Sequence, residues 1–194
     1  MPLGANKAAI MGVAGVSTGD VTLISSQTAS NSASISFTSI PDYGEIIFKF
    51  YSVRPATDEA RLTFQASTDN SSYGMTITNT YFRTIHYESD SSTNFEYEPS
   101  TDNAQSTSFI TLTEDTGNDA DQACAGELHL FSNASTTYVK HFYARLGTST
   151  SDNSFRESYL GGYINDGSND VTALQFKMSS GNIAAGTFKL WGVK

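Results

Sequence analysis

The stretch IIFKFYSV, residues 46–53, shows most clearly how this chain folds. Phe48 and Phe50 share one parity along it, and Ile47 and Tyr51 have the other. Successive side chains of a β-strand point to opposite faces, so this two-residue period predicts a strand. The same period recurs along the chain after about residue 20, and helical periodicity is nearly absent.

Working outward from this stretch, the alternation predicts roughly ten strands. They cover residues 33–37, 47–53, 62–66, 75–82, 109–112, 126–131, 138–146, 155–164, 171–178 and 188–193. The polar segment SNASTT, residues 132–137, predicts a long antiparallel hairpin over residues 125–146, and NDGSND, residues 165–170, predicts a second turn. Strands without intervening helices argue against a parallel α/β sheet and leave a sandwich, a jelly roll or a closed barrel. We favour an all-β fold, a single jelly-roll-like antiparallel β-sandwich over residues 21–194.

Composition supports one folded domain. The chain has 194 residues, a length that single all-β domains commonly reach. Charged residues make up only 16% and hydrophobic residues 38%, which leaves a large share of Ser, Thr and Asn suited to loops. The aromatic share of 12% argues against disorder, because buried rings offset chain entropy.

Charge and cysteine content limit the partners and the compartment. The formal net charge of −9 repels phosphate backbones, and no stripe of Lys and Arg reverses it, so we expect no nucleic-acid binding. No apolar run approaches the length that crosses a bilayer, so we expect a soluble protein with no membrane partner. Cys124 is the only cysteine, which excludes an intramolecular disulfide and fits synthesis in a reducing compartment. We recognise no signal peptide at the N-terminus.

The first 20 residues lack strand alternation. Residues 5–14 are compatible with a short helix, an arm, or a segment that becomes ordered only against a partner, and a frayed terminus is the alternative. We interpret residues 1–20 as an N-terminal arm or docking segment.

The acidic, Ser/Thr-rich stretch of residues 88–107 is too polar for a core strand and long for a simple connection, which predicts a mobile loop or a binding surface. Within it, Phe95 and Tyr97 alternate with Glu96 and Glu98. Together with Tyr87, these rings are candidates for contact with a sugar or a subunit. The alternative is that they anchor a long loop onto the sandwich.

Signatures of catalysis are missing from the sequence. No G-x-S-x-G pattern occurs, and Cys124, between two alanines, is predicted to be a small buried thiol. His86, His129 and His141 match no compact zinc pattern. His129 and His141 could meet across the predicted hairpin and share a metal, but ordinary structural or surface histidines are more common.

Other features also favour structural readings. Residues 115–121 and 165–170 offer oxygen ligands of the kind that calcium accepts, but neither has EF-hand spacing, so we expect solvated turns and no cofactor, with calcium as a minor alternative. Gly161 and Gly162 lie in a predicted strand and indicate a bulge or a site of close packing. The carboxylates, Glu45, Glu96, Glu127 and Glu157 among them, permit many pairings for glycoside hydrolysis and indicate none.

Three segments resemble a known group of proteins. MPLGANKAAIMGVAG at the start, SGNIAAGTFKLWGVK at the end and CAGELHLFSNASTTYVKHFYA between them are similar to small virion structural proteins of tailed bacteriophages, especially marine ones. The resemblance spans most of the chain and rests on strand and terminus patterns, without a motif that assigns functional residues. It implies a tail, fibre or baseplate-associated sandwich or a capsid decoration protein, assembled as a homotrimer.

From these observations we expect a non-enzymatic virion protein, made in the host cytoplasm and bound to other virion proteins through residues 1–20. The main alternative is a carbohydrate-binding, receptor-binding module that recognises a host surface glycan through Tyr87, Phe95 and Tyr97. A polysaccharide hydrolase is the weakest reading, since only the supply of carboxylates supports it.

Overall fold

The computed structural model describes residues 20–194, so the predicted arm of residues 1–20 lies outside the described part except for Asp20. The described residues form thirteen strands and no helix. The strands are β1 (Val21–Ser32), β2 (Ile35–Phe37), β3 (Glu45–Pro55), β4 (Leu62–Ser67), β5 (Ile77–Tyr87), β6 (Thr93–Tyr97), β7 (Asn103–Ser106), β8 (Ile110–Thr111), β9 (Cys124–Phe131), β10 (Lys140–Ser149), β11 (Ser154–Ile164), β12 (Ala173–Met178) and β13 (Ile183–Val193).

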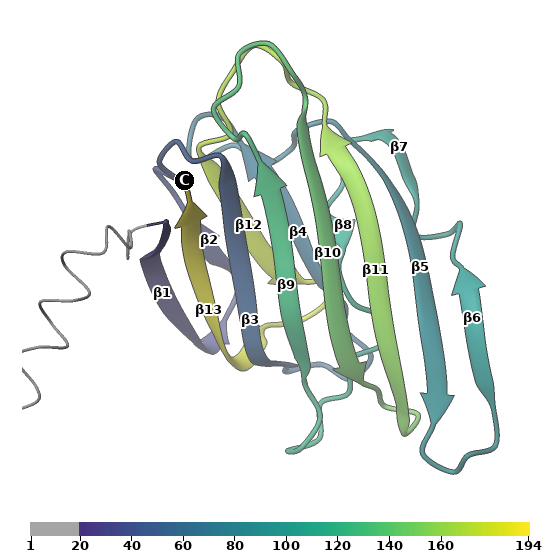
Figure 1. Ribbon diagram of the computed structural model, residues 1–194. Helices are drawn as coiled ribbons and strands as arrows, with labels where there is room; N and C mark the ends of the chain where they lie inside the picture. Colours follow the sequence, from purple (N-terminus) through teal and green to yellow (C-terminus); the bar gives the residue numbers. More distant parts are fainter. Residues whose placement is uncertain (1–19) are drawn as a thin grey trace, which may run out of the picture.

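Two antiparallel sheets form a sandwich, as predicted (Figure 1). The large sheet has nine strands in the order β1-β13-β3-β9-β10-β11-β5-β6, with β7 also paired to β5. The small sheet has four strands in the order β2-β12-β4-β8 and lies against one face of the large sheet. This topology is compatible with a jelly roll.

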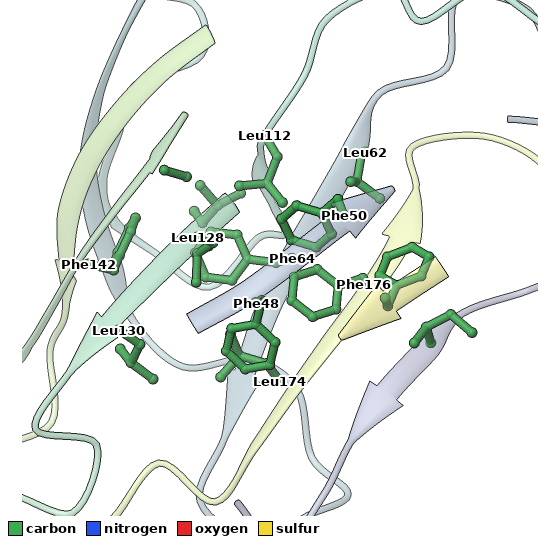
Figure 2. Close-up of a cluster of buried hydrophobic side chains, with 14 of the residues drawn as sticks. Phe48, Phe50, Leu62, Phe64, Leu112, Leu128, Leu130, Phe142, Leu174 and Phe176 are labelled. Atoms are coloured by element: carbon green, nitrogen blue, oxygen red, sulfur yellow. The ribbon is translucent and has the colours of Figure 1, made fainter. Parts of the chain in front are cut away.

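Phenylalanine rings from both sheets fill the core between them (Figure 2). Phe176 of β12 packs against Phe48 and Phe50 of β3, with ring centroids 5.2 and 5.1 Å apart. Phe64 of β4 meets Phe142 of β10 edge to face at 5.2 Å. Such edge-to-face pairs add to the free energy gained by burial alone. The alternation that identified β3 therefore places its even-numbered rings in the core.

The hairpin and the turn at residues 165–170 are confirmed. β9 and β10 pair in antiparallel register, and residues 165–170 lie on the connection from β11 in the large sheet to β12 in the small sheet. The buried side chain of Lys140 holds this connection, since its Nζ donates to the carbonyl oxygens of Asp166 and Asn169, each at 2.5 Å.

Two expectations about strands need correction. The predicted ranges begin at residue 33 and miss β1, which forms an edge of the large sheet and buries only Ala29 completely. An edge strand with so little burial carries few apolar residues, so its alternation is weak. The second correction concerns the mobile loop that is one of the two alternatives for residues 88–107, because these residues contain β6 and β7. The other alternative, a binding surface, stays a prediction. Both strands pair with β5 in spite of their polar composition, because β5 supplies the backbone partners.

Within residues 20–194, no helix is long and apolar enough to span a membrane.

Candidate binding surface

We define the outer face as the side of the large sheet that points away from the small sheet. Strand alternation places there the side chains that lie between the core positions. In β10, Phe142, Ala144 and Leu146 are buried, whereas Tyr143 and Arg145 are exposed on the outer face. The same alternation in β11 places Tyr159 outward. The outer face is therefore rich in rings although its strands also form the core.

One row of side chains crosses the outer face from β3 to β11. Ile47 of β3 pairs with His129 of β9, which pairs with Tyr143 of β10, which pairs with Gly161 of β11. The His129 and Tyr143 rings stack with centroids 4.5 Å apart and planes 11° apart. Tyr143 is nevertheless 45% exposed.

A second row lies beside the first and continues toward the β6 edge. Arg145 pairs with Tyr159, and Tyr159 pairs with Phe82 of β5. The Tyr159 and Phe82 rings stack at 5.0 Å with planes 6° apart, and the guanidinium carbon of Arg145 lies 5.4 Å from the Tyr159 centroid. Phe95 of β6 adds a tilted contact to Phe82 at 5.6 Å. Rings from three neighbouring strands thus form one cluster.

The charged side chains among these rings are paired. Arg145 Nε donates to Glu157 at 2.5 Å, and Lys49 Nζ lies 3.3 Å from Glu127. Desolvation would raise the pKa of Glu157, but the bonds from Arg145 and Tyr159 outweigh it and hold the pKa below its ordinary value. The pKa of Arg145 is raised by its bond to Glu157. The outer face therefore presents rings together with neutralised ion pairs.

Two shallow hollows open on this face. One, of about 390 Å³, lies between Tyr143, Gly161 and Thr80 and is bounded by Arg145 and Tyr159. The other, of about 410 Å³, is lined by the ion pairs described above and by Tyr51 and Gly147. Each hollow includes a glycine, and the row of outward-pointing side chains is interrupted there because glycine has no side chain.

The structure separates the three predicted contact residues. Phe95 and Tyr97 lie on the outer face, 69% and 56% exposed, because they pair with Thr84 and Phe82. Tyr87 lies in β5 with the parity of the buried Tyr81 and therefore points to the opposite side of the sheet. A site that uses all three rings together is not formed.

Tyr159 and Phe82, the other members of the ring cluster, and Tyr143 in the neighbouring row are not among the predicted site residues. A signal for Tyr143 existed in the sequence, because His141, Tyr143 and Arg145 alternate with apolar residues inside the predicted hairpin. Tyr159 and Phe82 meet only through the pairing of β11 with β5, which the sequence alone does not show.

Among the described residues, the cysteine is buried and one of the two histidines suggested as metal ligands is paired with carboxylates. Burial raises the pKa of the Cys124 thiol to about 12, so the thiolate is strongly disfavoured, and the predicted burial is confirmed. No three His, Cys, Asp or Glu side chains among residues 20–194 are grouped so as to hold a metal ion. His129, one half of the suggested histidine pair, contacts Glu45 at 2.5 Å and Glu127 at 3.2 Å.

The two acidic loops also have internal partners. Asp166 accepts bonds from the backbone of Ser168 and Asn169 at 2.8 and 3.0 Å, while Lys140 binds the carbonyl groups of the same turn. Asp115, in the other loop, pairs with Arg61 and Arg156. The carboxylates of Asp115 and Asp166 therefore already have partners within the chain.

Arg83 of β5 joins three carboxylates on the inner side of the large sheet. Arg83 lies 2.8 Å from Glu96 and 3.2 Å from Glu98, and it also contacts the buried Glu114. These ion pairs tie β6 to β5 and to the loop that follows β8. We interpret them as structural, because the carboxylates are occupied by the guanidinium group.

Comparison with known proteins adds no relative. No family model matches the chain, and no curated protein matches its sequence.

Proposed function

We propose that the chain is a non-enzymatic virion structural protein of a tailed phage that is attached at one edge of its large sheet and presents the outer face to a partner. The resemblance of three sequence segments to small phage virion proteins supports the virion role. The observation that supports attachment at one edge, with the outer face presented to a partner, is the separation of the two edges of the large sheet. β1 and β6 lie at opposite edges of the large sheet.

The attachment edge is where residues 1–19 join the sandwich. Asp20 begins this edge, and its carbonyl oxygen accepts a bond of 3.0 Å from the N–H of Lys194. Both ends of the described chain therefore meet at the β1 edge, and the ring cluster lies on β11, β5 and β6, toward the other edge. In this proposal, residues 1–20 bind other virion proteins from the β1 edge. We include a homotrimer in the proposal because the resemblance implies one.

Immunogold electron microscopy of virions tests the proposal. An antibody against the chain should label particles of the phage that encodes it, and the label should show whether the protein lies on the head or the tail. A chain lacking residues 1–19 keeps Asp20 and its bond to Lys194, so it should fold with an unchanged unfolding midpoint and yet be absent from particles. Unlabelled virions would exclude the virion role, and normal incorporation of the shortened chain would exclude attachment through the arm.

A second candidate is a carbohydrate-binding module. The observation that favours it is the gathering of Tyr143, Tyr159, Phe82 and Phe95 on one face beside paired polar groups. Aromatic faces bind the C–H side of sugars while neighbouring polar groups bind the hydroxyls. Both roles are compatible in one protein, because a particle component can also recognise a host surface glycan.

A further inference from the structure

One of the two shallow hollows on the outer face extends over three adjacent strands. Tyr143 of β10, Gly161 of β11 and Thr80 of β5 are cross-strand partners in one row. They line the hollow of about 390 Å³, and Arg145, Tyr159 and Phe82 from the neighbouring row line it as well. We call this hollow the Tyr143 slot. Its floor is the backbone of β11 at Gly161.

One face of the Tyr143 ring is available in this slot. His129, the cross-strand neighbour on β9, stacks on the other face at 4.5 Å with nearly parallel planes, and Phe131, also of β9, makes a tilted contact with the ring at 5.8 Å. The free face is therefore turned toward β11, where Gly161 has no side chain to cover it. Tyr159 differs, because Phe82 stacks on it and Arg145 lies over its ring. Among the rings that line this hollow, Tyr143 is thus the one with a face open to a ligand.

Neither backbone conformation nor packing explains the glycine at position 161. Its φ is outside the left-handed region that favours glycine, and a Cβ built on it would meet only the carbonyl oxygen of Phe142, at an ordinary 3.8 Å. Glycine in the interior of a strand is destabilising relative to alanine. The consequence of glycine here is an open floor beneath the free face of Tyr143, which suggests that the space itself is used.

We propose that the Tyr143 slot binds one neutral pyranose unit of a glycan. A pyranose has an apolar C–H face that fits the free face of Tyr143, and its hydroxyl groups match Thr80 and Arg145 at the rim. The site has no free charge, because Arg145 pairs with Glu157 at 2.5 Å and the hydroxyl of Tyr159 donates to the same carboxylate at 2.5 Å. The net charge of −9 further disfavours anionic sugars.

An extended peptide fits the slot less well. Peptides that bind sheets commonly add a strand to a free edge, where unpaired backbone groups are available. β11 is paired with β10 on one side and with β5 on the other throughout the slot. A ligand at Gly161 must therefore be held by side chains and by the ring face, as a sugar is.

Glycan-binding measurements with single variants test the site. The purified full chain is applied to an array of neutral glucan, mannan and galactan oligosaccharides, and its binding is compared with that of Tyr143→Ala and Gly161→Leu. The first variant removes the ring and the second fills the slot with a side chain, so each should reduce binding at least tenfold. Tyr138→Ala is the matched control, since this ring is 72% exposed outside the slot, and it should bind as the unmodified chain does.

Several outcomes would overturn the proposal. These are no binding to any neutral oligosaccharide, binding only to sialylated or uronate-containing glycans, and full binding by both slot variants. If Gly161→Leu dissociates an oligomer of a chain that binds no glycan, the slot is a contact between copies instead. Tyr143→Trp keeps a stacking face and should retain binding. Comparison of this variant with Tyr143→Ala separates loss of the ring from misfolding.

This inference rests on the carbohydrate-binding role and is independent of the location in a virion. Unlabelled virions would exclude the virion role and leave glycan binding by the purified chain intact. Labelled virions together with a chain that binds no glycan would exclude the slot and leave the virion role intact.

Discussion

At the scale of single residues, Asp152 connects the fold to pH. Its carboxylate accepts bonds from Thr150 at 2.5 Å, Ser154 at 2.6 Å and Arg156 at 2.7 Å. Desolvation raises its pKa, but the bonds from Ser154, Thr150 and Arg156 outweigh this and lower the pKa from 3.8 to about 2. A carboxyl group with a lowered pKa in the folded state stabilises the protein above its ordinary pKa. That stabilisation is lost as the pH falls from about 4 to about 2.

We predict that Asp152→Asn flattens the dependence of stability on pH below about 4. The lowering of the Asp152 pKa from 3.8 to about 2 corresponds to about 2.5 kcal/mol. Because the Asp152 side chain is 38% exposed, solvent screening reduces the expected loss at neutral pH to about 1 kcal/mol. Urea unfolding at several pH values measures the effect, with the exposed Asp42→Asn as the control. Equal pH dependence in Asp152→Asn and the unmodified chain would contradict the assignment.

At the scale of elements, the approach of β11 to β5 depends on Gly162. A Cβ at this position would lie 2.2 Å from the carbonyl oxygen of Thr78 and 2.8 Å from the Cα of Asn79. Both clashing atoms belong to the backbone of β5, which cannot move without disturbing the pairing of the two strands. The close packing that the sequence predicted for the glycine pair is thus confirmed at Gly162.

We predict that Gly162→Ala destabilises the protein by about 1–3 kcal/mol, because the methyl group forces the paired strands apart. Gly161→Ala is the matched control, since the space around a Cβ at position 161 is open, and it should be neutral or slightly stabilising. The free energies of unfolding in urea give the comparison. Equal effects of the two substitutions would show that β5 and β11 adjust to the added methyl group.

How well each element could be predicted depended on its burial. β3 was predictable because Phe48 and Phe50 alternate with outward residues and both enter the core. β1 was missed because it is an edge strand that faces solvent over most of its length, and β6 was assigned to a loop because all but one of its side chains are exposed. Both β1 and β6 form because they pair with a neighbouring strand. A single sequence shows which residues are buried more clearly than it shows which strands pair.

The same reason limits prediction of the candidate surface. Phe95 and Tyr97 lie on one exposed strand, in keeping with their local alternation with Glu96 and Glu98, and their role in binding stays a prediction. Tyr87 points to the other side of the sheet, because β5 extends to residue 87 and this position has the parity of the buried Tyr81. The Tyr143 slot required the register of β10 with β11 and of β11 with β5, which residue patterns along one strand do not contain.

At the scale of the whole molecule, one buried cluster extends from Ala29 to Leu190 and includes residues of both sheets. A sandwich with a single core should unfold in one cooperative step. Two probes report on different strands of it. Cys124 begins β9 and is buried, and Trp191, the only tryptophan, lies in β13.

We predict that the Cys124 thiol becomes reactive only when the whole sandwich unfolds. Its burial, together with a pKa raised to about 12, should protect it from a disulfide reagent at pH 8 in the native state. In increasing urea, the onset of thiol labelling should coincide with the change in Trp191 fluorescence, since Cys124 and the β13 residues Phe188 and Leu190 belong to the same core. A Cys124→Ala chain provides the unlabelled control. Labelling well below the urea concentration at which Trp191 responds would mean that the β9 region opens separately from β13, and that the sandwich consists of more than one cooperative unit.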